Sequence, residues 1–168
     1  MPLRRHQLHR RGETARHPDL STRVLPARDG QGALVETICG KEQLSLTSGS
    51  PTVYPHRSEG NGKIIHIHFC PTCGTKTHMT FERFPEIVGV FSGTFDEKGW
   101  FGRNPDNTLY FFLENAPDGR VIPAGFDVFD AHYWAAEGTP APAQRFTQHT
   151  LVTVEVRDAA RARLKKGI

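Results

Sequence analysis

The segment HFCPTCGTKTH, residues 68–78, contains two of the three cysteines of the chain. Cys70 and Cys73 are separated by two residues. This spacing allows two thiolates to bind one metal ion, a dithiol to undergo redox exchange, or two small side chains to pack in a core. The type of element that follows Cys73 separates these alternatives.

The residues around the cysteine pair favour metal binding over redox exchange. A redox-active pair sits at the start of a helix, whose N-terminus lowers the thiol pKa. Here residues 74–81 alternate and contain Gly and Thr, which predicts a strand. Pro71 and Gly74 favour a tight turn whose backbone N–H groups point at the thiolates. Zinc binds four tetrahedral N or S ligands, so the pair would form half of a zinc-ribbon-like site.

Further ligands are available nearby in the sequence. His66 and His68 share a strand face with Cys70, because strand side chains alternate with a period of two. His78 lies on the predicted return strand, and Cys39 ends an earlier strand pattern. The alternative role for the histidines is local hydrogen bonding in half-buried strands. For Cys39 the alternative is core packing as a small hydrophobe.

The elements that must position these side chains are short strands separated by turn residues. This spacing favours an antiparallel, mainly-β domain with little helix. The strand-like segments are ALVETIC (33–39), EQLSLTSG (42–49), PTVYP (51–55, an edge piece), KIIHIHF (63–69), KTHMTF (76–81), EIVGVFSG (86–93) and TLYFFLEN (108–115).

The C-terminal third has a different residue pattern. Residues 131–144, AHYWAAEGTPAPAQ, predict a short helical turn followed by a loop. Residues 151–156, LVTVEV, predict a late strand. Residues 157–167, RDAARARLKKG, predict a helix with basic residues in its last turn and a terminal Gly.

Charge and composition restrict the function classes. The net charge of +3 arises in residues 1–30, which contain seven Arg and three acidic residues, so the remaining body is near neutral. We therefore do not expect a nucleic-acid surface. No apolar run is long enough to span a membrane, and three cysteines do not form a disulfide framework. We expect a cytoplasmic protein in a reducing environment.

These patterns predict three segments. Residues 1–30 are an atypical Arg-rich segment, poorly ordered or irregular. Residues 31–140 form the β domain, and residues 141–168 form a loop, a strand and a short helix. An exposed strand edge would allow a homodimer.

The blocks QLSLTSGSPTVY, HFCPTCGT, VGVFSGTFDE and DVFDAHYW together resemble the glutathione-dependent formaldehyde-activating enzyme family, which includes centromere protein V-like proteins. The resemblance runs from about Leu44 to Trp134. It implies antiparallel sheets of the β-tent type and zinc as the cofactor. It also implies that Cys70 and Cys73 join an N-terminal Cys-x-Cys to hold a structural zinc, while a Cys-x-Cys-x-x-Cys set holds a catalytic zinc beside glutathione. The implied reaction is reversible carbon–sulfur bond formation between formaldehyde and the glutathione thiol.

The chain departs from this family pattern before residue 70. Only Cys39 precedes Cys70, so both N-terminal cysteine motifs are absent. The segment most similar to the missing catalytic motif is RHQLHRRG, in which His6, His9 and Arg10 stand roughly where the family has its last two catalytic cysteines and an Arg. One explanation of this departure is a shifted reading frame, because the composition of residues 1–30 is what a GC-rich gene gives in such a frame. The alternative is that the chain is a divergent, non-catalytic member of the family.

Two functions follow from the sequence. The first is a carbon–sulfur lyase by descent, acting on glutathione–formaldehyde adducts and inactive as written because the cysteine motifs are missing. The second is a non-enzymatic, zinc-stabilised β-domain used for binding.

Overall fold

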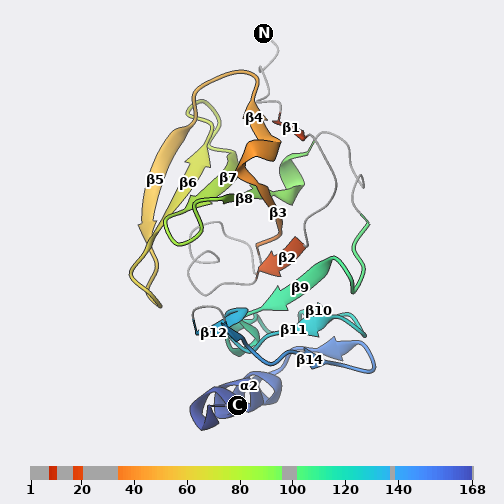
Figure 1. The fold of residues 1–168 in the computed structure, drawn as a ribbon. Helices are drawn as coiled ribbons and strands as arrows, with labels where there is room; N and C mark the ends of the chain where they lie inside the picture. The colour runs from red at the N-terminus through yellow and green to blue at the C-terminus, as the bar shows by residue number, and fades with distance from the viewer. Residues whose placement is uncertain (1–7, 11–16, 21–33, 96–101, 137–138, 168) are drawn as a thin grey trace. The chain divides into compact units, whose positions relative to one another are not determined.

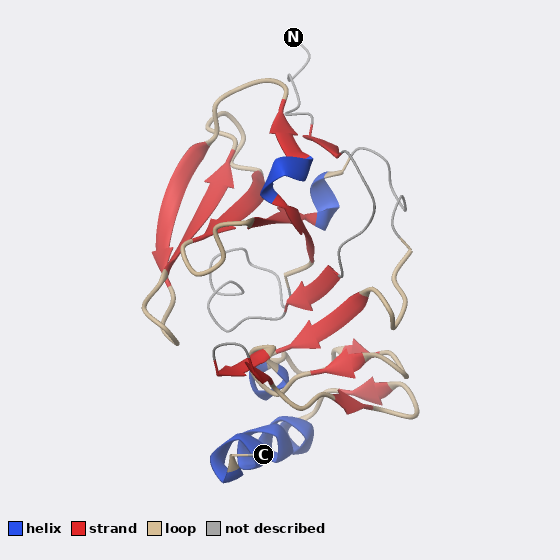
Figure 2. Ribbon diagram, in the orientation of Figure 1, coloured by secondary structure: helices blue, strands red, loops and turns tan. Residues whose placement is uncertain are grey.

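The computed structural model describes residues 8–10, 17–20, 34–95, 102–136 and 139–167. The chain divides into two compact units, the first made of Met1–Ala15 and Glu36–Gly102 and the second of Arg16–Val35 and Arg103–Ile168. Among the described residues, strands dominate (Figure 2). The described helical segments are one α-helix and three 3-10 turns. The expected mainly-β fold with antiparallel sheets and little helix is confirmed. None of the described helices is long and apolar enough to cross a membrane.

A five-stranded antiparallel sheet forms most of the first unit (Figure 1). Its strands lie in the order β3-β8-β7-β6-β5. Their bounds are β3 Glu36–Gly40, β5 Thr52–Arg57, β6 Ile64–Phe69, β7 Lys76–Phe81 and β8 Ile87–Phe91. The PTVYP segment therefore lies on the edge strand, as predicted.

The middle of this sheet is buried on both faces. In β7 the three consecutive residues Thr77, His78 and Met79 are all buried, which is expected of a strand flanked on both sides and covered on both faces. The register places His68 of β6 opposite His78 of β7. Position 68 is therefore a neighbour of position 78 on one face of the sheet.

Smaller elements complete the first unit. Strand β1 (Leu8–Arg10) pairs antiparallel with β4 (Leu44–Leu46). Two 3-10 turns, η1 (Lys41–Gln43) and η2 (Ser92–Thr94), follow β3 and β8.

Gly89 lies on β8, at a position where packing leaves no room for a side chain larger than a hydrogen atom. A Cβ atom at this position would lie 2.6 Å from Oε2 of Glu36 and 3.2 Å from Cζ of Phe81. Glu36 is itself only 2% exposed, so its carboxylate has little space in which to move. The glycine is therefore required by close packing rather than by backbone conformation.

We expect Gly89→Ala to destabilise the first unit by about 1–2 kcal/mol, because the extra methyl group overpacks a filled site. Chemical denaturation with circular dichroism measures this loss. Gly60→Ala is the matched control, since nothing lies within 4 Å of its added Cβ. Equal effects of the two substitutions would show that Glu36 and Phe81 accommodate the methyl group.

The second unit combines small sheets with the helix. A four-stranded sheet has the order β14-β11-β9-β2, and two further strand pairs are β10-β15 and β12-β13. The bounds are β2 His17–Leu20, β9 Thr108–Phe111, β10 Val121–Ile122, β11 Asp127–Val128, β12 Trp134–Ala136, β13 Thr139–Pro140, β14 Gln144–Arg145 and β15 Thr150–Leu151, with the 3-10 turn η3 at Leu113–Asn115 and the helix α2 at Val154–Lys166.

Strand β9 pairs in parallel with both β2 and β11. We expected mostly antiparallel strands, and this sheet is mixed. The difference arises because β9 and β11 are joined by a long connection that contains η3 and β10, whereas only short hairpin connections enforce antiparallel neighbours.

Two local predictions in this unit are wrong. Residues 131–144 contain the hairpin β12–β13 rather than a helical turn, and the aromatic residue Trp134 pairs with Pro140. Residues 151–156 are not a strand, because only Thr150–Leu151 is extended and α2 begins at Val154.

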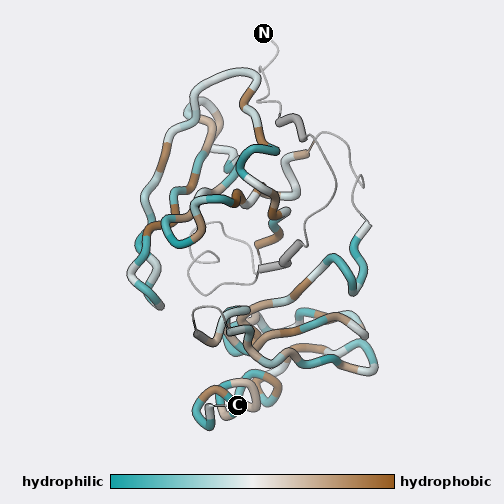
Figure 3. Tube along the Cα trace, in the orientation of Figure 1, coloured by the Kyte–Doolittle hydropathy of each residue, from teal (hydrophilic) through white to brown (hydrophobic). Residues whose placement is uncertain are grey.

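The start of α2 has a local cause. The side chain of Thr153 accepts a hydrogen bond from the backbone N–H of Val156, and Glu155 lies in the first turn. A threonine N-cap followed by an acidic residue stabilises a helix start more than the β-propensity of two valines opposes it. Figure 3 shows hydrophilic and hydrophobic residues alternating along α2, as expected of a helix with one face on a core.

The core of the second unit joins this helix to the strands. Its buried members come from β9, η3, β10, β11 and α2, together with the connecting segments. They are Tyr110, Leu113, Ala116, Ile122, Val128, Val152 and Ala160.

Candidate functional site

The cysteine pair lies on a tight turn between β6 and β7, as the sequence predicts. The backbone N–H of Cys70 donates to the carbonyl of Thr75, and the N–H of Gly74 donates to the carbonyl of Cys70, both at 2.9 Å. Gly74 has a φ of 72°, in the left-handed region that glycine adopts without strain. We call residues 70–75 the knuckle.

The knuckle stabilises a thiolate at Cys70. The backbone N–H groups of Cys73 and Thr72 donate to the sulfur of Cys70 and lower the pKa of its thiol. The side chains of Cys73 and Thr72 contribute to the same lowering of the pKa. Cys70 is buried, whereas Cys73 is exposed and its Sγ lies 3.2 Å from the hydroxyl of Thr75. The turn therefore has one buried sulfur and one exposed sulfur.

The element after Cys73 is strand β7, not a helix. The helix N-terminus that activates redox-active cysteine pairs is absent from this part of the structure. The lowered pKa of Cys70 comes instead from the N–H groups of the turn, an arrangement that also suits a metal ligand.

His68 and His78 form a stacked pair on one face of the sheet. Their ring centroids are 4.1 Å apart and the ring planes differ by 14°. Nε2 of His68 lies 3.1 Å from the hydroxyl of Thr80, and Nδ1 of His78 lies 3.1 Å from the hydroxyl of Thr77. Because ring lone pairs lie in the ring plane, two parallel stacked rings do not aim them at one ion.

Burial disfavours the charged form of both stacked histidines. It lowers the pKa of His78 to about 4, with a smaller contribution from neighbouring His68. It also lowers the pKa of His68, to which His66 contributes. The pair is therefore neutral near pH 7.

Cys39 packs in the core of the first unit, against Val88 and Val90 with Leu44 and Phe95 beside them. In the register of the sheet it lies level with Thr80, because Cys39 is opposite Val88 and Val88 is opposite Thr80. The start of β7 is four residues from Thr80, or about 13 Å along the strand. Cys39 is thus a core residue remote from the knuckle.

The described residues contain no group of three or more His, Cys, Asp or Glu side chains that could hold a metal ion. The structure therefore does not bring His66, His68 or Cys39 together with Cys70 and Cys73 into one metal site, although the sequence allowed it. His66 of β6 lies opposite Thr80 of β7 and is half-buried.

The family comparison agrees with these sequence blocks. The family model described as glutathione-dependent formaldehyde-activating enzyme matches residues 27–112, just over half of the chain. The chain belongs to this family. No curated protein and no solved structure matches the chain. The matched region contains the whole five-stranded sheet and the knuckle, whereas α2 lies beyond it.

Zinc, which the family implies, fits the donor set of this chain only in part. The knuckle supplies two thiols with N–H groups directed at one of them, which suits two of the four ligands of a structural zinc. The third cysteine of the chain is in the core, and His68 and His78 are stacked. The residues present do not fit the three-cysteine set of the family's catalytic zinc.

The expectations for the N-terminal segment fall largely outside the described residues. His6 lies outside them, and for His9 and Arg10 only the backbone is described, as part of β1. The expected poor order of residues 1–30 and the suggested His6–His9 substitution for zinc ligands remain predictions.

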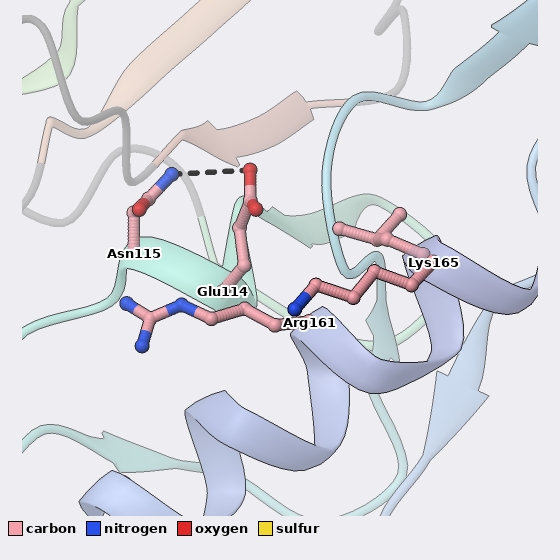
Figure 4. Close-up of a pocket in the computed structure, with 5 residues that line it drawn as sticks. Glu114, Asn115, Arg161 and Lys165 are labelled. Atoms are coloured by element: carbon pink, nitrogen blue, oxygen red, sulfur yellow. Dashed lines mark hydrogen bonds between the residues drawn. The ribbon is translucent and has the colours of Figure 1, made fainter.

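A second candidate is an open groove in the second unit, between η3 and α2 (Figure 4). Glu114 and Asn115 line it from η3, and Arg161 and Lys165 line it from α2. Asn115 donates to Glu114 at 3.1 Å, and Arg161 pairs with Asp158 at 3.0 Å. Side chains of both signs that are already engaged at an exposed surface make this a weaker site than the knuckle.

Glu36 is a buried residue that the sequence patterns did not single out. This carboxylate is 2% exposed on β3, in the middle of the apolar segment 33–39. A lone acidic residue inside a β-prone run was the available signal, because buried carboxylates are uncommon and often functional.

Proposed function

We propose that this family member is descended from a zinc-dependent carbon–sulfur lyase acting on glutathione–formaldehyde adducts, and that the chain as written does not catalyse the reaction. The observation that carries the proposal is the placement of its three cysteines. Two lie in the knuckle and the third is buried in a core. No thiol remains to form the second, three-cysteine set.

Activation of glutathione is the step that lacks a catalyst. The thiol of glutathione should resemble that of free cysteine, with a pKa of about 8.5, so only a few per cent is thiolate at neutral pH. Zinc would supply Lewis-acid stabilisation of the thiolate in the family reaction. Among the described histidines near the knuckle, His68 and His78 hold hydrogen bonds to threonine hydroxyls and stack on each other. They are poorly placed to replace this activation.

Exchange NMR on formaldehyde and glutathione with added zinc tests the proposal. We expect this chain to give the spontaneous rate of S-hydroxymethylglutathione formation. A matched version with the family's cysteine motifs restored in residues 1–30 should accelerate it. Equal acceleration by both chains would contradict the proposal and direct attention to His66, His68 and His78.

The second candidate function is a non-enzymatic binding domain of the β-tent type. The edge strand β5 favours it, since Val53 and Tyr54 are 43% and 40% exposed there. An exposed strand edge with apolar side chains can pair with another chain, including a second copy. Size-exclusion chromatography with light scattering distinguishes a monomer from this homodimer.

The proposed location is a reducing compartment, the cytoplasm. The three cysteines are free thiols in the structure, and an exposed thiol such as Cys73 persists most readily where the surroundings are reducing.

A further inference from the structure

We propose that Asn61, at the tip of the β5–β6 hairpin, is a site of spontaneous chemical modification that converts its side-chain amide into a carboxylate. The reaction requires only the neighbouring backbone nitrogen and water. The site is independent of both candidate functions, because neither a metal ion nor a cysteine takes part in it.

The residue that follows an asparagine determines how readily this reaction occurs. The chain contains four asparagines, Asn61, Asn104, Asn107 and Asn115, which are followed by Gly, Pro, Thr and Ala, respectively. The reaction begins when the backbone nitrogen of the following residue attacks Cγ of the asparagine. Proline has no N–H to lose, and the Cβ atom of threonine or alanine crowds the attacking nitrogen. The glycine after Asn61 leaves this nitrogen unobstructed.

The hairpin tip exposes Asn61 and polarises its side chain. Asn61 is exposed and lies between Arg57, the last residue of β5, and Ile64, the first residue of β6. The backbone N–H of Lys63 donates a hydrogen bond of 3.0 Å to Oδ1 of Asn61. This bond draws electron density from Cγ and stabilises the negative charge that develops on Oδ1 during the attack. It also turns the side chain toward the following backbone, where the attacking nitrogen lies.

A second hydrogen bond slows the reaction in the folded chain. The N–H of Gly62 donates to the carbonyl of Ser58 at 2.9 Å, and this bond must open before the nitrogen can attack. The bond belongs to a turn at the end of a hairpin, where local opening requires little free energy. Asn61 should therefore react more slowly in the folded than in the unfolded chain, but still faster than the other three asparagines.

The atoms balance without an oxidant or a cofactor. The nitrogen of Gly62 loses its proton and forms a bond to Cγ of Asn61, and the side-chain nitrogen leaves as ammonia, which gives a cyclic imide. Water then opens the imide at either carbonyl carbon. Opening at Cγ gives aspartate, whereas opening at the backbone carbonyl carbon gives isoaspartate, in which the main chain runs through Cβ.

Both products change the hairpin. Each places a negative charge at position 61, close to Lys63, which already pairs with Glu82 at 3.5 Å. Isoaspartate also adds one atom to the backbone of the turn, across which the N–H of Ser58 donates to the carbonyl of Lys63 at 2.9 Å. Because turn length sets the register of a hairpin, the isoaspartate form should shift the edge strand β5 against β6.

Incubation of the full chain at mildly alkaline pH, followed by protease digestion and mass spectrometry, tests the proposal. The peptide that contains Asn61 should gain the mass difference between an amide and a carboxylic acid and should separate into aspartate and isoaspartate forms. An isoaspartate-specific methyltransferase identifies the second form. The rate at Asn61 should exceed that at Asn107 or Asn115 by about tenfold or more, a barrier difference of about 1.4 kcal/mol.

Asn61→Gln is the matched control, because it keeps a neutral amide at the exposed tip but would have to form a larger and less favourable ring. Its tip peptide should keep its mass, and circular dichroism checks that the variant folds. The same incubation in urea measures the rate without the hydrogen bond from Gly62 to Ser58. Conversion of Asn61 no faster than that of Asn107, or conversion in urea but none in the folded chain, would overturn the proposal.

Discussion

Acidification from pH 6.5 to about 4 should destabilise the first unit by about 3 kcal/mol through His78 alone. The side chain is 4% exposed, and burial lowers its pKa to about 4. In the unfolded chain the same imidazole has a pKa of about 6.5. Over this pH range the unfolded state therefore binds a proton that the folded state does not bind.

The sign follows from linkage. Stability falls with decreasing pH wherever the unfolded state binds more protons. The contribution of His78 is fully present above pH 6.5 and is lost as the pH falls toward about 4. The pKa of His68 is lowered in the same direction, so its protonation adds to the loss.

Urea unfolding across this pH range in a metal-free buffer measures how the free energy of unfolding changes with pH. Amide exchange of β6 and β7 shows whether the pH-dependent unfolding occurs in these strands. His78→Phe keeps a ring against His68 and removes the titrating group. The pH dependence of the free energy of unfolding should then correspond to about one fewer proton taken up on unfolding. His149→Phe is the control, because His149 is exposed. If the slope is the same in His78→Phe as in the unmodified chain, burial of His78 is not the source of the acid sensitivity.

Asp130→Ala should destabilise the second unit by about 2–3 kcal/mol, because it leaves charged and polar donors without their acceptor. Asp130 accepts hydrogen bonds from Nε and Nη2 of Arg163, both at 2.8 Å, and from Gln144 at 2.5 Å. Its side chain is 10% exposed and that of Arg163 is 32% exposed. This bidentate salt bridge connects the last turns of α2 to the segment after β11.

The chain offers a matched control for this pair. Asp158 and Arg161 also form an Asp–Arg pair on α2, at 3.0 Å, but their side chains are 61% and 45% exposed. Asp158→Ala should change the free energy of unfolding by no more than about 0.5 kcal/mol, as for other exposed ion pairs. Thermal or urea unfolding of both variants gives the comparison. Similar losses would mean that solvent screens Asp130 as much as Asp158.

Local sequence determined the knuckle itself. Alternation in residues 63–69 and 76–81, with Pro71 and Gly74 between them, is enough to specify strand, turn and strand, and the structure has all three. These preferences act between residues close in the chain, so they can be recognised without knowing what packs against them. The helix at the C-terminus was partly recognisable for the same reason, although its start at Val154 depended on the Thr153 cap.

Only the tertiary structure decided which side chains accompany the cysteine pair. The sequence left His66, His68 and Cys39 open as further ligands, since a strand pattern shows which residues share a face but not which strands become neighbours. The sheet order places Cys39 on β3 at one edge, with β8 between it and β7, while the β6–β7 register stacks His68 on His78. Strand neighbours depend on burial and on contacts between distant segments, as the parallel pairing of β9 with β11 also illustrates. For that reason the two thiols were evident from the sequence, whereas the small number of partners around them was not.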